Sequence, residues 1–381
     1  MKWSSIVLLG ILLFSWSTIY AETLEPASFP SLVSSISVAT PLEFCGEPVP
    51  GEMHEIRERL EKEFLISLWH QAQVILWLKR SRRYLPDIEV MLKQSGMPDD
   101  LKYVPIVESA LRPHVVSKKG ATGFWQFMKH TGRQYGLVIN THIDERRNIF
   151  ASTKAAIRYF KDLYDTFGSW TLAAAGYNMG EGQLMAAILE QQTDTYYHLY
   201  LPSETERYVF KILSAKLIFS DPERYGFHLS EDDYYPPLEF DRVKIDCAQD
   251  TPIRTIAQAA NTYFKKIRDL NPQVRKHYLP EGSHEILIPK GASNHFHARY
   301  QLLLKNLLAD LKNRTYVVKK GDNLSAIAEQ FNVPLAALTI WNRLDLKAAI
   351  HPGDQLIIYR SQLNTVQIDE DEGKLGSLYN D

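Results

Sequence analysis

The sequence is poor in cysteine, which limits the covalent and metal chemistry available to it. Among 381 residues only Cys45 and Cys247 are cysteine. Two cysteines cannot complete a zinc site by themselves, and the 12 histidines show no HExxH or similar spacing. We therefore expect no metal ion and no cofactor. The two thiols could pair in an oxidising compartment or stay as two separate buried thiols, and the sequence leaves both possibilities open.

The sequence also lacks a strong net charge and a long apolar run. A net charge of −2 gives no reason to expect nucleic acid as a partner. Beyond the N-terminus, no segment has the length of a transmembrane helix. The one marked apolar run, residues 6–19, follows Lys2 and leads to the small residue Ala21. This pattern predicts a signal peptide over 1–21 and an exported protein, with an uncleaved anchor helix as the alternative. No cysteine follows the run directly, so we expect no lipid anchor there.

The long middle part of the chain has the periodicity of helices. Residues 22–51 are rich in Pro and Ser and predict a linker. From residue 52 to 229 apolar residues recur at helical spacing, and no β alternation competes. Expected breaks fall at Pro86, 96–98, 112–113 and 120, and expected helices include 55–79, 154–167, 171–177 and 206–219. The sequence therefore predicts a mainly α fold, with an N-terminal helical segment (52–98) and a larger α domain (99–232).

The C-terminal part contains an internal repeat. Two segments, 240–291 and 314–360, share the order strand, helix, helix, strand, with an Asn after the second helix and a Gly-containing turn before the closing strand. The expected elements are 243–245, 255–260, 264–270 and 285–289 in the first copy, and 316–318, 324–331, 334–341 and 355–359 in the second. The first copy is degenerate. The acidic tail, 361–381, is predicted to be disordered.

One carboxylate has an unusual setting. Glu108 lies in the apolar run 104–111. Burial against apolar side chains disfavours the charged form and raises the pKa of a carboxyl group. A carboxyl that stays protonated near neutral pH can donate its proton to a glycosidic oxygen. The alternative is an amphipathic helix with Glu108 on its solvent face.

Four motifs succeed one another along the chain. Residues 108–109 read ES, 120–128 read GATGFWQFM, 175–182 read AGYNMGEG, and 204–209 contain ET-x-x-YV. In this order and at these distances they resemble the lysozyme-like lytic transglycosylases of the soluble-lytic-transglycosylase family. Two further stretches, 77–81 and 84–89, resemble the N-terminal helices of the membrane-bound transglycosylase D branch, and 316–324 resembles the opening of a LysM domain. The resemblance covers roughly residues 52–360.

The resemblance implies a lysozyme-like α-helical domain followed by small βααβ LysM-type modules. It makes Glu108 the single catalytic acid/base. It also assigns a group of residues to the substrate cleft: Ser109, Gln126, Met128, Tyr177, Asn178, Glu204 and Tyr208. In one place this chain departs from the family, which usually shows Glu-Thr-Arg where Glu204-Thr205-Glu206 stands here, with Arg207 one place later. This departure puts the local ion pairing in doubt.

The implied substrate is peptidoglycan, and the implied location is the periplasm or cell envelope. Ordinary glycosidases use two carboxyl groups, whereas the family uses one. Glu108 is expected to protonate the oxygen between N-acetylmuramic acid and N-acetylglucosamine, with help from the neighbouring N-acetyl group. It then deprotonates the C6 hydroxyl, which closes a 1,6-anhydro ring. The LysM resemblance implies glycan binding by Gly321, Asp322, Leu324 and Asn342.

Two alternatives remain. A lysozyme-like or chitinase-like hydrolase would need a second carboxylate, for which Asp144, Glu145 and Asp162 are candidates. A catalytically inactive peptidoglycan-binding scaffold would need no acid at all. The products released from peptidoglycan distinguish the three possibilities.

Overall fold

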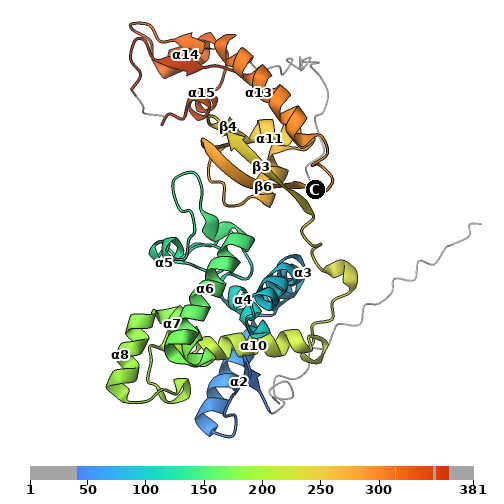
Figure 1. Cartoon of the computed structure of the whole chain (residues 1–381), viewed down its shortest axis with the longest axis vertical. Helices are drawn as coiled ribbons and strands as arrows, with labels where there is room; N and C mark the ends of the chain where they lie inside the picture. Colours follow the sequence, from blue (N-terminus) through green and yellow to red (C-terminus); the bar gives the residue numbers. More distant parts are fainter. Residues whose placement is uncertain (1–40, 314, 346–348, 360–381) are drawn as a thin grey trace, which may run out of the picture. The chain divides into compact units, whose positions relative to one another are not determined.

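The computed structural model of the chain describes residues 41–313, 315–345 and 349–359 (Figure 1). It divides into two compact units, residues 1–238 and 239–381. The expected signal peptide (1–21) and acidic tail (361–381) lie outside the described residues. The expectation of a mainly α fold is confirmed, since helices make up most of the first unit and a large part of the second.

The described part of the first unit, from residue 41, begins with a β-hairpin. Strands β1 (Glu43–Phe44) and β2 (Glu47–Pro48) pair antiparallel across a turn in which Cys45 and Gly46 both have positive φ angles. This is the backbone that a tight hairpin turn requires. Leu42, Phe44 and Val49 lie in the core of the unit. The end of the expected linker is therefore part of the folded domain, which the sequence did not indicate because two-residue strands show no alternation.

Two helices come next, α2 (His54–Trp69) and α3 (Gln71–Gln94). The single helical pattern expected over 55–79 is interrupted at His70, whose backbone leaves the helical region. The break expected at Pro86 is wrong, because α3 continues through it. A proline inside a helix costs about 3 kcal/mol. The apolar face that offsets this cost is buried: Val74, Leu78, Leu85, Ile88 and Leu92.

The rest of the first unit is built around α10 (Tyr208–Ser220). This helix is buried on nearly every side and packs against α2 and against α7 (Trp170–Met179). Such a helix needs apolar residues all round rather than along one stripe. The other elements are η1 (Asp99–Tyr103), α4 (Val104–Ser109), α5 (Lys129–Gln134), η2 (Glu145–Arg147), α6 (Ile149–Phe167), α8 (Glu181–Gln191), η3 (Tyr196–His198), α9 (Ser203–Glu206), η4 (Glu223–Tyr225) and η5 (Glu231–Asp233). The helices expected over 154–167, 171–177 and 206–219 are confirmed as parts of α6, α7 and α9–α10.

The second unit starts with the degenerate module. Strands β3 (Phe240–Cys247) and β6 (Gly282–Pro289) pair antiparallel, with Phe240 opposite Pro289. Between them lie α11 (Ile253–Ala259), α12 (Phe264–Leu270) and the short pair β4 (Thr251–Pro252) and β5 (Tyr278–Leu279). The predicted order strand, helix, helix, strand is confirmed.

A helix that was not expected from the sequence completes this module. Helix α13 (Phe296–Asn313) packs against α11 and buries the side chains of Phe296, Tyr300 and Leu307. The spacing of these three residues is helical, so the signal was present in the sequence. The module therefore extends beyond the expected boundary at residue 291.

The last module has the order β7 (Thr315–Val317), α14 (Leu324–Gln330), α15 (Leu335–Asn342) and β8 (Gln355–Ile357). Strands β7 and β8 pair antiparallel over a small core of their own. Asn323 is the N-cap of α14, since its side chain accepts a hydrogen bond from Ala326 N (2.9 Å).

An asparagine joins the second helix of each module to its closing strand. Asn271 Nδ2 donates to Ile267 O (2.8 Å) and Leu287 O (2.7 Å), while its Oδ1 accepts from Leu287 N (2.9 Å). Asn342 makes the same contacts, with the carbonyl four residues before it (2.9 Å) and both backbone groups of Ile357 (2.8 and 2.6 Å). This repeated asparagine bridge supports the internal repeat.

Candidate active site

Glu108 lies in the last turn of the short helix α4, next to a strained turn. Ala110 and Leu111, which end the helix, both have left-handed φ angles of 53° and 56°. Two consecutive non-glycine residues in this region are uncommon and cost energy. Leu111 is only 1% exposed, so its burial holds the turn in place. The turn fixes the direction in which α4 presents Glu108.

The Glu108 carboxyl group has a raised pKa and one strong hydrogen bond. Tyr208 Oη donates to Glu108 Oε1 at 2.5 Å. The pKa of Glu108 is raised to about 7, and burial is the largest cause. The hydrogen bond from Tyr208 and the charge of Lys211 lower this pKa, while the charge of Glu204 raises it. The raised pKa expected from the apolar run is therefore present. Near neutral pH the group can both donate and accept a proton.

The glycine-rich loop beside Glu108 depends on one glycine in particular. A Cβ atom on Gly123 would lie 1.8 Å from Arg146 O, and its φ is +87°. No other residue fits this close approach. Arg146 also donates to Phe127 O (3.1 Å), and Trp125 Nε1 donates to Thr153 Oγ1 (2.9 Å). The loop is thus fixed to η2 and α6.

Three expected cleft residues lie on α4 or on this loop. The buried Ser109 hydroxyl donates to Phe124 O (2.8 Å), which joins α4 to the loop. Gln126 has a φ of 50°, and its Nε2 donates to Gly123 O (2.8 Å). Met128 is 44% exposed at the start of α5. Ser109 and Gln126 therefore hold the loop, whereas Met128 offers an open surface.

The end of α7 supplies a further pair of expected residues. Tyr177 Oη donates to Trp125 O (2.6 Å), and its ring stacks on Phe160 with centroids 4.5 Å apart. The charge of Glu108 is one cause of the raised pKa of Tyr177, which places the two groups close together. Asn178 Oδ1 accepts from Thr205 Oγ1 (2.8 Å), so α7 is tied to α9.

The structure thus brings segments far apart in sequence to one place. Tyr208, Tyr177 and Glu204 all interact with Glu108 by a hydrogen bond or by charge. Lys211, which the motifs did not include, also has a charge that reaches Glu108. Lys211 comes three positions after Tyr208, a spacing that puts both on one helix face, so the signal was available in the sequence.

Glu206 stands where the family usually has an arginine, and the structure shows which contacts Glu206 and the following Arg207 make. Glu206 Oε1 accepts a hydrogen bond from Leu201 N (3.3 Å). Arg207 pairs with Glu63 on α2, and its second contact, from Nη2 to Oε2, measures 3.0 Å. Glu63 is only 2% exposed, so the ion pair satisfies a buried charge. The ion pair at this position is therefore made by Arg207, and it joins the residue before α10 to α2.

The other candidate carboxylates have structural contacts. Asp144 pairs with Arg146 at 2.8 Å, and hydrogen bonds from Arg146 help hold its pKa below the usual range. Glu145 accepts from Val138 N at 2.7 Å, and Asp162 is hydrogen-bonded to Tyr135.

Across the described parts of the chain, no group of three His, Cys, Asp or Glu side chains is arranged to hold a metal ion. Cys45 and Cys247 are both free thiols.

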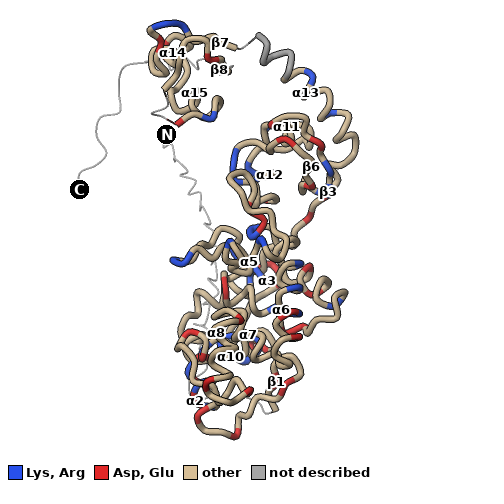
Figure 2. The backbone as a smooth tube through the Cα atoms, turned by 60° about the vertical axis from the view of Figure 1, so that its left-hand side comes forward, with Lys and Arg blue, Asp and Glu red and all other residues tan. Residues whose placement is uncertain are grey.

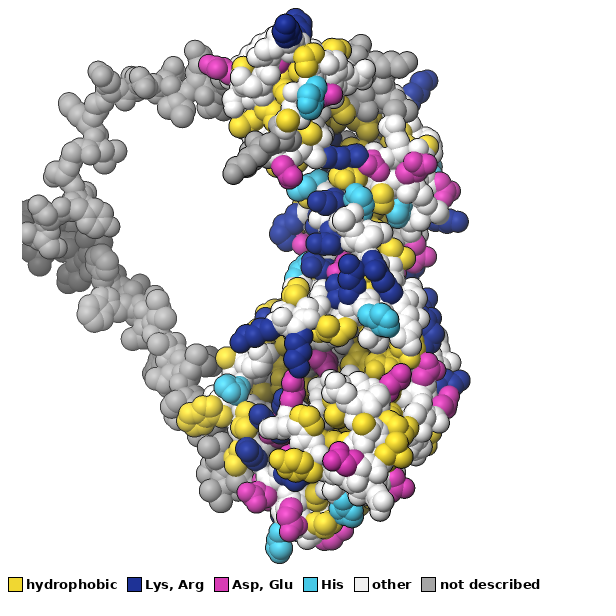
Figure 3. All heavy atoms as spheres, turned by 90° about the vertical axis from the view of Figure 1, so that its left-hand side faces the viewer, with side chains coloured by type: hydrophobic (Ala, Val, Ile, Leu, Met, Phe, Trp, Pro, Cys, Tyr) yellow, Lys and Arg dark blue, Asp and Glu magenta, His cyan; other side chains and the backbone are white. Residues whose placement is uncertain are grey.

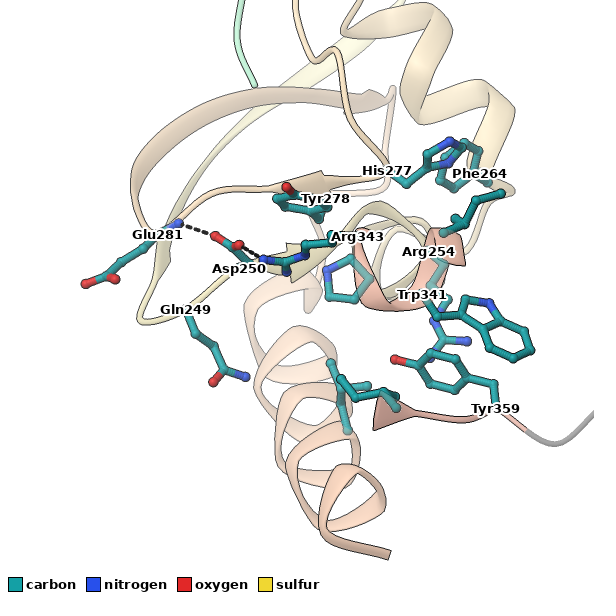
Figure 4. A pocket seen from close by; sticks show the side chains of 14 residues that line it. Gln249, Asp250, Arg254, Phe264, His277, Tyr278, Glu281, Trp341, Arg343 and Tyr359 are labelled. Carbon is teal, nitrogen blue, oxygen red and sulfur yellow. Dashed lines mark hydrogen bonds and ion pairs between the residues drawn. The ribbon is translucent and has the colours of Figure 1, made fainter. Parts of the chain in front are cut away.

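The second unit contains a cavity of about 600 Å³ lined by aromatic and basic side chains (Figure 4). Arg343 lies over the Tyr278 ring (3.8 Å to the centroid), and Arg254 lies over the Tyr359 ring (4.1 Å). Trp341 meets Tyr359 edge-on at 5.2 Å. An arginine side chain therefore covers one face of each of the two tyrosine rings.

The expected LysM residues have different settings. Gly321 and Asp322 form the turn before α14, where Asp322 Oδ2 accepts from Lys319 N (2.7 Å). Leu324 belongs to the module core, and the amide of Asn342 forms the asparagine bridge. Of the four, Gly321 is exposed, Asp322 and Asn342 are half-buried and Leu324 is buried. Glycan binding by all four stays a prediction.

The face in Figure 3 shows charged side chains of both signs among apolar ones, and Lys and Arg side chains are concentrated toward the middle of the view. Among the described residues, no helix is both long and apolar enough to cross a bilayer.

The α domain with its half-buried acid and the two βααβ modules together define a transglycosylase-type domain followed by LysM-type modules. Family models agree: Transglycosylase SLT domain matches residues 88–199, LysM domain matches 316–358, and the LysM-like domain of lytic transglycosylase MltD matches 239–305. Membrane-bound lytic murein transglycosylase D of Escherichia coli K12 is 32% identical over 321 residues, which cover 81% of this chain and 69% of that protein. The chain therefore belongs to the lytic murein transglycosylase D family.

Other similar proteins match over shorter stretches. A putative tributyltin chloride resistance protein of Alteromonas is 32% identical over 117 residues, 30% of this chain and 56% of that protein. Among solved structures, the 70 kDa soluble lytic transglycosylase SLT70 of Escherichia coli covers 46% of this chain and 32% of its own length, with 18% identity and a TM-score of 0.32. The lytic transglycosylase Slt of Pseudomonas aeruginosa covers 39% and 26%, with 20% identity and a TM-score of 0.28. These scores describe a partial likeness only.

Proposed function

We propose that this protein is a peptidoglycan lytic transglycosylase that cleaves the bond between N-acetylmuramic acid and N-acetylglucosamine without water. The observation that carries the proposal is the state of Glu108, a half-buried carboxyl group with a pKa of about 7 and a hydrogen bond from Tyr208. Membership of the lytic transglycosylase family supports it. A scaffold without activity would have no need for an acid kept in this state.

The proposed reaction uses Glu108 twice. Protonated Glu108 gives its proton to the glycosidic oxygen while the bond from that oxygen to the muramic C1 breaks. The neighbouring N-acetyl group stabilises the positive charge at C1. Ionised Glu108 then takes the proton from the muramic C6 hydroxyl, whose oxygen bonds to C1 and closes a 1,6-anhydro ring. Glu108 ends the cycle protonated, as it began.

The neighbours of Glu108 would assist both steps. The Tyr208 hydrogen bond and the positive charge of Lys211 favour the carboxylate formed after the first proton transfer. The charge of Glu204 and burial favour the protonated form. These opposing influences hold the pKa near 7, where proton donation and acceptance are both accessible. Met128 and Glu204 are exposed, and we expect both to contact the glycan.

We further propose that the protein is exported to the periplasm or cell envelope and held on peptidoglycan by its C-terminal modules. Weak glycan binding by the Gly321–Asp322 turn, or by the cavity of the second unit, would raise the concentration of the catalytic unit at its substrate.

The test is mass spectrometry of the products released from purified sacculi. Wild-type protein should release muropeptides with 1,6-anhydro ends, whereas Glu108→Gln should release none. Glu190→Gln, which changes an exposed carboxylate on α8, is the matched control and should behave as wild type. Equal release by wild type and Glu108→Gln would exclude the role of Glu108. No release by any variant, with sacculus binding intact, would identify a binding scaffold.

A second candidate function rests on Glu204. Its charge raises the pKa of Glu108, so a second carboxylate lies near the acid. A lysozyme-like hydrolase would use such a group to activate water. Hydrated reducing ends from the wild type, lost in Glu204→Gln, would establish that function instead.

A further inference from the structure

Two arginines meet at the carbonyl groups that directly follow the catalytic acid. Arg80, on α3, donates from Nη1 to Ala110 O (3.2 Å), and Arg112 donates from Nε to Ser109 O (3.1 Å). The left-handed turn at Ala110 and Leu111 brings these carbonyls and Arg112 together. Each guanidinium group has five N–H donors, and each of these contacts uses one.

Capping the end of α4 does not account for both arginines. Cations are favourable at the C-terminal end of a helix, but a second cation repels the first. Burial lowers the pKa of Arg80, and the charge of Arg112 lowers it further. Tyr235 and Tyr84 partly offset this by raising the pKa, and Arg83 makes the smallest contribution, which lowers it. The cluster of Arg80, Arg83 and Arg112 therefore carries an electrostatic cost in the free protein.

Carboxylates are available nearby, but they pair with other residues. Lys79 pairs with Asp233 (3.8 Å), and Arg82 pairs with Glu231. Arg83 instead donates to Pro236 O (3.2 Å) and lies over the Tyr235 ring. Within residues 41–313, none of the three clustered arginines forms an ion pair with a carboxylate. Figure 2 marks the basic residues along α3 in blue.

The accessibility of the pair suits an external anion. Arg112 is exposed and Arg80 is half-buried, so their unused N–H donors can be reached from solvent. Arg112 comes only four residues after Glu108. The exposed Lys118 and Lys119, a few residues further along the chain, add positive charge. A guanidinium group matches the geometry of a carboxylate, which it can bind with two parallel hydrogen bonds.

We propose that Arg80 and Arg112 form a binding site for a carboxylate of the peptide attached to the muramic sugar, so that the protein prefers peptide-bearing over denuded glycan strands. The inference rests on the proposed function and adds a substrate preference to it. Peptide stems of peptidoglycan carry free carboxylates and hang from the sugar whose bond is cleaved. An anionic stem would relieve the repulsion between the arginines, and the gain would appear as substrate affinity.

The experiment compares two soluble substrates, peptide-bearing strands and the same strands stripped of peptides by an amidase. The rate of formation of anhydro ends gives kcat/KM for each. The wild type should prefer peptide-bearing strands, and Arg112→Gln should lower the ratio of the two kcat/KM values by about tenfold, the range of a charge-assisted pair of hydrogen bonds. Arg112→Lys should give a ratio between those of wild type and Arg112→Gln, because lysine keeps the positive charge but lacks the two parallel N–H donors of a guanidinium group. Lys154→Gln, an exposed cation on α6, should leave the ratio as in wild type.

An equal ratio in wild type and Arg112→Gln would overturn the inference while leaving the transglycosylase function intact. If the wild type formed no anhydro ends, the proposed function itself would fail. In that case the carboxylate site is tested by a binding measurement with the Glu108→Gln variant. Its affinity is measured for a soluble muropeptide and for the same muropeptide with its carboxylates amidated. Tighter binding of the free acid, lost in Glu108→Gln/Arg112→Gln, would support the site, and equal binding of both muropeptides would overturn it. Circular dichroism and thermal unfolding check that Arg112→Gln keeps the turn at Ser109.

Discussion

Glu108 is held where its ionised form is costly. Its pKa of about 7 lies above the ordinary value of 4.5, chiefly because of burial. Each pKa unit corresponds to about 1.4 kcal/mol of difference between the two protonation states. The folded protein therefore loses stability as Glu108 ionises, between its unfolded-state pKa and its folded-state pKa.

This cost predicts a pH-dependent difference in stability between wild type and Glu108→Gln. Near pH 4 the carboxyl group is largely protonated in both the folded and unfolded states, so ionisation contributes little. As the pH rises through 7 the wild type bears the cost of ionisation and the glutamine variant does not, so the variant should gain about 3 kcal/mol relative to wild type by pH 8. Urea unfolding at pH 4, 6 and 8 measures this. A difference that stays constant with pH would contradict the raised pKa.

The hydroxyl group of Tyr208 leads to a second prediction, which concerns the pH dependence of activity. Its hydrogen bond favours the ionised carboxylate and so lowers the pKa of Glu108. Protonated Glu108 starts the reaction, so kcat/KM should fall as pH rises through about 7 in the wild type. In Tyr208→Phe this fall should move to higher pH, and kcat should drop about tenfold or more, a typical range for a lost catalytic hydrogen bond. Tyr200→Phe, which changes a tyrosine that is 84% exposed, is the control for the pH profile.

Among the elements, the N-terminal hairpin connects the segments that carry the site. Glu47, on β2, accepts hydrogen bonds from Thr171 N (3.1 Å) and Ser169 Oγ (3.0 Å) and also from Trp170 N, all at the start of α7. In the turn of the hairpin, Cys45 N donates to Asp100 Oδ2 (2.7 Å), just before α4. The hairpin thus links the helix that carries Tyr177 to the one that carries Glu108.

Removal of this link should loosen the site. Glu47→Ala leaves the N–H groups at the start of α7 without an acceptor, and we expect a loss of about 2–3 kcal/mol in the free energy of unfolding. The value of kcat should fall more than KM changes, because the distance between α7 and α4 affects the reacting groups. Glu52→Ala, an exposed glutamate nearby, is the control. An unchanged unfolding midpoint in Glu47→Ala would show that water replaces the carboxylate.

Features that depend on local spacing could be predicted from the sequence, and features that depend on distant contacts could not. Helices α6 and α10 and both βααβ modules follow from apolar spacing, and they were found. The helix break predicted at Pro86 was wrong, because the packing of α3 against the core outweighs the low helix propensity of proline. Lys211 could have been found from its spacing to Tyr208. The arginine pair could not have been predicted, because Arg80 and Arg112 lie far apart in sequence. Only the turn after Glu108 brings them together.

At the scale of the whole molecule, each of the two units has its own core. We expect scanning calorimetry of the full chain to resolve more than one unfolding transition. Glu47→Ala should lower only the transition of the first unit, and Asn342→Ala only that of the last module. The second change removes a bridge of three hydrogen bonds and should cost about 2–4 kcal/mol. Gln258→Ala, at an exposed position on α11, is the control, and movement of both transitions by one variant would contradict separate cores.

The asparagine bridge also has a consequence for how such modules can diverge. The bridge spans 16 residues from Asn271 to Leu287 but 15 from Asn342 to Ile357. Because one side chain fastens the closing strand, the loop in between tolerates insertion or deletion without loss of the fold. Duplicated copies can therefore drift apart in loop length and composition, and acquire different ligands, while each remains able to fold.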